Sequence, residues 1–82
     1  MSNLVTALIM CKMQVGMDEK VIAEIKKLEQ IQEASVTYGA YDLVIKVNFK
    51  TIEELDKFLF GKIRRIPGII ETSSMIVAKQ VV

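Results

Sequence analysis

The chain alternates two kinds of hydrophobic periodicity, and their order leaves few folds open. Apolar residues stand at alternate or successive positions where strands are predicted, and recur every three or four positions where helices are predicted. In chain order, the sequence predicts a strand over Leu4–Met13, a helix from Asp18, strands over Ile31–Tyr38 and Leu43–Phe49, a helix after Thr51, and a strand over Ile69–Val82. The order is therefore strand, helix, strand, strand, helix, strand.

The first predicted helix carries charges that agree with its direction. Asp18 and Glu19 place acids at the positive end of the helix dipole, and Lys26 and Lys27 come near its close. Its apolar residues, at three- and four-residue spacing, are Val21, Ile22, Ile25 and Leu28. This single stripe is typical of a helix that packs on one face against a core.

The second predicted helix begins with a capping box formed by Thr51 and Glu54. Its apolar stripe consists of Ile52, Leu55, Phe58, Leu59 and Ile63. Pro67-Gly68 is expected to stop the helix after a basic last turn. In that turn Arg64 and Arg65 are either solvated or in contact with a phosphate or carboxylate.

This order is that of the split βαβ arrangement of ferredoxin-like α+β folds, in which two helices cover one face of a four-stranded antiparallel sheet. The other face stays uncovered. Depending on register, the first strand would present to it either Leu4, Leu8 and Met10 or Val5, Ala7 and Ile9. Covering such apolar area with a second copy contributes about 25 cal/mol per Å². The pattern therefore predicts a dimer with two sheets face to face.

Composition narrows the possible functions of this single 82-residue domain. Eleven basic and ten acidic side chains give a net charge of +1. The chain therefore has no strong positive electrostatic potential that would attract nucleic acid. With no histidine and one cysteine, the chain cannot build a disulfide, a His/Cys metal site or a histidine-activated nucleophile. Cys11 is expected to be a small buried strand residue. Neither a membrane span nor a signal peptide is found, so a cytoplasmic protein without cofactor is expected.

Turn chemistry, an aromatic ring and a carboxylate coincide in the loop Gly39-Ala40-Tyr41-Asp42, between the two central strands. Gly39 can take a positive φ, and Asp42 can bond nearby amides, so one interpretation is a plain hairpin turn. Tyr41 beside the carboxylate favours a second interpretation, a loop that grips a cationic ligand. Downstream, the hydroxyls of Thr72-Ser73-Ser74 either are solvated strand positions or line something polar.

With this order and this loop, the sequence resembles the RAM (regulation of amino-acid metabolism) domain of Lrp/AsnC transcription regulators over essentially the whole chain. The resemblance is carried by Gly-x-Tyr-Asp at Gly39–Asp42, the strand after it, and Ile66-Pro67-Gly68-Ile69 leading to Thr72-Ser73-Ser74. It implies a ferredoxin-like dimer, assembly of dimers into octameric or decameric rings, and free amino acids bound at contacts between dimers.

The resemblance also implies which residues bind the ligand. The family's Gly-x-Tyr-Asp loop falls on Gly39, Tyr41 and Asp42, with Ala40 between them, and the hydroxyl pair of its last strand falls on Thr72 and Ser74. In the family this module normally follows a DNA-binding helix-turn-helix domain, whereas residue 1 here already opens the first strand. A stand-alone module is therefore expected, with no DNA binding of its own, that modulates a DNA-binding relative.

The chemistry of a free amino acid agrees with these residues. Its ammonium group needs an anion such as Asp42, and its carboxylate needs amides near Gly39 or hydroxyls. The leading hypothesis is a non-enzymatic amino-acid sensor. One alternative is a small enzyme on the same dimeric fold, whose acid/base candidates Asp42, Tyr38 and Tyr41 all come from one loop. The other is an oligomerisation module without ligand.

Overall fold

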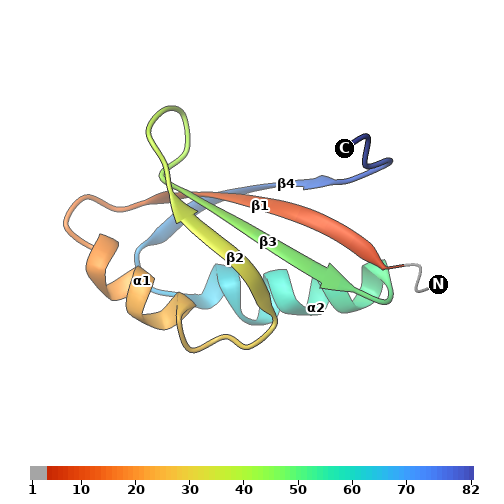
Figure 1. Ribbon diagram of the computed structural model, residues 1–82. Helices are drawn as coiled ribbons and strands as arrows, with labels where there is room; N and C mark the ends of the chain where they lie inside the picture. The colour runs from red at the N-terminus through yellow and green to blue at the C-terminus, as the bar shows by residue number, and fades with distance from the viewer. Residues whose placement is uncertain (1–3) are drawn as a thin grey trace.

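A computed structural model describes residues 4–82 of the chain. The elements, shown in Figure 1, are β1 (Val5–Met13), α1 (Asp18–Ile25), β2 (Ile31–Val36), β3 (Leu43–Phe49), α2 (Ile52–Gly61), the 3-10 helix η1 (Ile63–Arg65) and β4 (Ile69–Ile76). The strands form one antiparallel sheet in the order β2-β3-β1-β4. This confirms the predicted order of elements and the ferredoxin-like fold.

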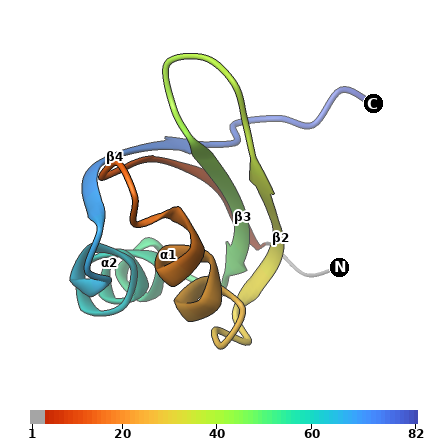
Figure 2. The same ribbon diagram turned by 90° about the vertical axis from the view of Figure 1, so that its left-hand side faces the viewer.

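Both helices lie on one face of the sheet, which curls around them (Figures 1 and 2). Side chains alternate between faces along each strand, so the register decides which residues meet the helices. In β1 the helix-facing residues Ala7, Ile9 and Cys11 are fully buried. They pack with side chains of β3, the helices, η1 and the residue after η1, namely Leu43, Ile45, Val47, Val21, Ile25, Leu55, Phe58, Leu59, Ile63 and Ile66.

The register settles which of the two predicted sets of β1 residues faces away from the helices. Leu8 and Met10 do so, and Leu8 pairs with Lys46 on one side and Met75 on the other. We call the surface formed by these residues the open face; its apolar centre consists of Leu8, Met10, Val44 and Met75. Polar pairs surround this centre: Lys12–Glu71, Lys46–Glu33, and the hydrogen bond from Thr6 to Asn48.

The α-helix α2 ends at Gly61, before the basic turn in which the sequence placed its end. Glycine is the weakest helix former after proline, and Lys62 leaves the α conformation with φ −121° and ψ −63°. The chain continues as the 3-10 turn η1, which still buries Ile63. At the other end, Ile52 is 50% exposed, so its place in the predicted stripe is wrong.

The predicted ends of β2 and β4 are also too late. β4 stops at Ile76, not at Val82, and Ile76 forms the last residue pair with β1, opposite Ala7. The last bond between the two segments runs from the amide of Val77 to the carbonyl of Thr6, at 2.9 Å. β2 stops at Val36 because the chain turns there into the loop before β3.

Candidate ligand-binding site

The loop between β2 and β3 projects beyond the end of the sheet, where β1 ends and β4 begins (Figures 1 and 2). Its base is closed by two bonds from Thr37: the amide donates to the carbonyl of Asp42 at 2.9 Å, and the hydroxyl donates to the carbonyl of Tyr41 at 2.7 Å. Gly39 reverses the chain with a φ of +119°, as predicted. Gly39 and Ala40 are exposed at the tip of the loop.

Asp42 ties the loop to β1 through both its backbone and its side chain. Its amide donates to the carbonyl of Cys11 at 2.9 Å, and its Oδ2 accepts from the amide of Met13 at 2.8 Å. The carboxylate thereby takes the place of a strand carbonyl at the end of the β1–β3 ladder. A carboxylate has two oxygens, so Oδ1 can accept from a ligand while Oδ2 holds the loop.

Tyr41 is half-buried at the base of the loop, beside a cation of the same chain. The Lys12 ammonium lies 5.9 Å from the centre of the Tyr41 ring, and 4.0 Å from the Glu71 carboxylate. The ring therefore already has a lysine within cation–π range. Tyr38, directly before Gly39, is fully exposed.

Thr72 and Ser74 lie on the other side of β1 from Asp42. They pair with Cys11 and Ile9, so both belong to the helix side of the edge strand β4. Two strand spacings, about 10 Å, separate β4 from β3. A single chain therefore brings Gly39, Ala40, Tyr41 and Asp42 together, and Thr72 and Ser74 together, but does not join the two groups.

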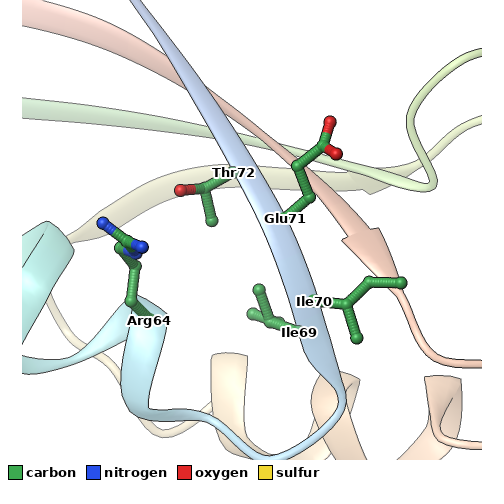
Figure 3. Close-up of a pocket in the computed structure, with 5 residues that line it drawn as sticks. All are labelled: Arg64, Ile69, Ile70, Glu71 and Thr72. Carbon is green, nitrogen blue, oxygen red and sulfur yellow. The ribbon is translucent and has the colours of Figure 1, made fainter.

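A cavity of about 280 Å³ lies between η1 and the start of β4. Arg64, Ile69, Ile70, Glu71 and Thr72 line it. Arg64 and Thr72 project toward each other on one side of β4, and Glu71 projects from the opposite side (Figure 3). The Arg64 guanidinium lies 5.0 Å from the centre of the Phe60 ring. From the sequence, Arg64 was either a solvated helix end or a contact for a phosphate or carboxylate, but it was not assigned to the ligand site; the four-residue spacing of Phe60 and Arg64 was the signal for this arrangement.

Cys11 is buried in the core, as predicted, and burial raises the pKa of its thiol from 9.0 to about 11. Within residues 4–82 no three His, Cys, Asp or Glu side chains cluster as metal ligands would. Over the same residues, no helix is both long and apolar enough to cross a membrane.

The sequence of this fold matches a known family over nearly its whole length. Residues 6–82 match the model of the Lrp/AsnC ligand binding domain. The chain belongs to the Lrp/AsnC family. Among curated relatives of this Lrp/AsnC domain, the HTH-type transcriptional regulator FL11 of Pyrococcus abyssi is 41% identical over 73 residues, which cover 89% of this chain and 48% of the relative.

Solved structures agree with the family and the fold of the Lrp/AsnC domain. FFRP-DM1 is 40% identical, with a TM-score of 0.83 over 89% of this chain and 97% of that one. AsnC of E. coli is 29% identical, with a TM-score of 0.89 over 95% of this chain and 53% of that one. The chain spans about half the length of the curated regulators that it matches, whereas it spans nearly all of FFRP-DM1.

Proposed function

We propose that this Lrp/AsnC domain is a non-enzymatic, cytoplasmic amino-acid sensor that oligomerises and modulates a transcription regulator of its family. The observation that carries the proposal is the match of residues 6–82 to a ligand binding domain whose curated relatives are transcriptional regulators. The Gly39–Asp42 loop supplies the chemistry that the proposal needs. Its carboxylate and exposed glycine backbone lie together at one end of the sheet.

The ligand's two charged groups need different partners. Oδ1 of Asp42 is suited to the ammonium group, while amides near Gly39 or the hydroxyls of Thr72 and Ser74 are suited to the carboxylate. Since β1 separates Asp42 from Thr72 within a protomer, a ligand that contacts both groups has to lie between protomers. The site is then complete only in the oligomer.

The open face supports the first step of assembly. Its apolar centre is ringed by charged and hydroxyl side chains, as in many protein interfaces. We therefore propose a dimer through this face, with further assembly of dimers into octameric or decameric rings. A DNA-binding relative that shares this domain could join such an assembly through the same face.

A thermal-shift screen against the twenty amino acids, with light scattering on the same samples, tests the proposal. One or a few amino acids are expected to raise the melting temperature of an assembly larger than a dimer. Loss of the Asp42 carboxylate in Asp42→Ala is expected to weaken binding by about 2–5 kcal/mol in calorimetric titration, because it removes the partner of the ammonium group.

Asp42→Asn separates the ligand role from the structural one. The asparagine side-chain oxygen can still accept from the Met13 amide, so the loop stays attached while the negative charge is lost. Asp56→Asn, at an exposed position of α2, is the matched control and is expected to bind as the wild type does. Unchanged affinity in Asp42→Asn would remove Asp42 from the site, and no stabilisation by any amino acid would overturn the proposed function.

A further inference from the structure

The cavity between η1 and β4 contains a positive charge that is not neutralised by an acid of residues 4–82. The ion pairs in this part of the chain are Lys12–Glu71, Lys27–Glu24 and Lys46–Glu33, and none involves Arg64. Glu71 also lines the cavity, but its carboxylate projects from the other side of β4, toward Lys12 (Figure 3). The side of the cavity between η1 and β4 therefore offers a cation and a hydroxyl.

Arg64, in η1, is held in place by Phe60 in the last turn of α2. Phe60 precedes it by four residues, and the guanidinium lies 5.0 Å from the centre of the phenyl ring. This contact restricts a long side chain that would otherwise sample many rotamers. Thr72 presents its hydroxyl from β4, and Ile69 provides an apolar wall on the same side (Figure 3).

A guanidinium and a hydroxyl that converge on one cavity complement a carboxylate. Arginine presents donors in a planar fork that matches the two oxygens of this anion, and a charge-assisted bond is about twice as strong as a neutral one. The cavity volume, about 280 Å³, suits a metabolite of amino-acid size.

We propose that Arg64 and Thr72 form the subsite for the carboxylate of the amino-acid ligand. This inference rests on the proposed function and extends it: the carboxylate lies at η1 and β4 of one protomer, and the ammonium group at Asp42 of a neighbouring protomer. Arg64 becomes the residue that makes a free carboxylate obligatory in the ligand.

The test compares each of the twenty amino acids with its primary carboxamide, in which the carboxylate is replaced by a neutral group of the same shape. Wild type, Arg64→Gln and Arg65→Gln are examined by thermal shift and then by calorimetric titration. Arg65 is the matched control because it belongs to the same 3-10 turn but does not line the cavity. Both arginines are exposed, so both variants are expected to fold.

The expected result is that only free acids raise the melting temperature, and that Arg64→Gln weakens their binding at least about tenfold while Arg65→Gln changes it less than about twofold. If carboxamides bind as well as acids, or if Arg64→Gln binds like wild type, the inference is overturned while the amino-acid sensor stands.

If no amino acid binds, the proposed function fails, and the cavity is tested directly with acetate and inorganic phosphate. A saturable change in the side-chain NMR signal of Arg64, and not of Arg65, on addition of acetate supports a carboxylate site. A response to phosphate alone identifies a phosphate site and overturns the inference, as does the absence of any response.

Discussion

Gly68 leads into β4 with a φ of +103°, at a position where a side chain has no room. An added Cβ would lie 2.8 Å from Met17 Cβ and 2.8 Å from Val21 Cγ2. Gly68→Ala is therefore expected to lower the free energy of unfolding by about 2–4 kcal/mol, because a strained backbone adds to overpacking. Urea denaturation monitored by circular dichroism measures this loss.

Gly39→Ala is the matched control for this prediction. Gly39 also has a positive φ, +119°, but nothing lies within 4 Å of an added Cβ. Only the cost of a positive φ in a non-glycine residue remains, so the free energy of unfolding is expected to fall by about 1–2 kcal/mol. Equal losses in the two variants would show that the contact with α1 contributes nothing.

The Cys11 thiol makes stability depend on pH in the alkaline range. Its pKa is about 11 in the folded protein against 9.0 when exposed. Above pH 9 the unfolded chain loses this proton while the folded chain keeps it, so the free energy of unfolding falls as the pH rises from 9 to 11. At pH 11 the loss is expected to be about 2 kcal/mol. In Cys11→Ala this part of the decline is expected to disappear. An identical decline in both proteins would contradict the assignment to Cys11.

At the residue scale, sequence reasoning found the loop but could not foresee how its carboxylate is used. The Gly39 turn follows from glycine's freedom at positive φ, which is a local property. The bond from the Met13 amide to Asp42 depends on strand register across 29 positions, which local pattern does not specify. The distance between Asp42 and Thr72 depends on strand order in the same way.

At the scale of the element, the capping box stabilises the start of α2. The Thr51 hydroxyl accepts from the amide of Glu54 at 3.1 Å, and Glu54 Oε2 accepts from the amide of Lys50 at 3.2 Å. Thr51→Ala is expected to lower the free energy of unfolding by about 1 kcal/mol, because an amide of the first turn loses its acceptor. Denaturant titration measures the loss; Thr51→Ser, which keeps the hydroxyl, should restore most of it. A serine variant as unstable as the alanine variant would argue against the cap.

Boundaries of elements with a strong local sequence signal were predicted to the residue, whereas boundaries without such a signal were not. β3 runs from Leu43 to Phe49 as its alternation indicates, and the residues Asp18 and Thr51 mark the starts of the helices. The end of β4 depends on where β1 stops offering hydrogen bonds, which is a tertiary property. The early end of α2 was predictable, because Gly61 is a poor helix former at the position where the α-helix ends.

At the scale of the whole molecule, the proposed dimer forms through the open face. Met10 lies at its apolar centre, so Met10→Glu would place a charge in the proposed dimer interface. The dissociation constant of the dimer is expected to rise roughly 100-fold or more. Sedimentation velocity measures it, with Val15→Glu as the control, since Val15 is 98% exposed in the turn after β1. Dissociation of both variants, or of neither, would place the interface elsewhere.

The overall fold was the most predictable level. Once two amphipathic helices and four strands are recognised in this order, right-handed crossovers leave one sheet topology. The two register options for β1 could not be separated from sequence, because that strand is apolar on both sides. Only its pairing with β3 decides that Leu8 and Met10 face away from the helices.

The strand order has a consequence for how the protein folds. β1 lies in the middle of the sheet, yet its partners are far along the chain: Val5 pairs with Phe49, and Ala7 pairs with Ile76. During synthesis β1 therefore leaves the ribosome well before either neighbouring strand exists. Such long-range pairing slows folding and leaves apolar surface open to aggregation in the meantime. The most apolar strand is made before both its partners, and only β4, the last strand to emerge, completes its pairing.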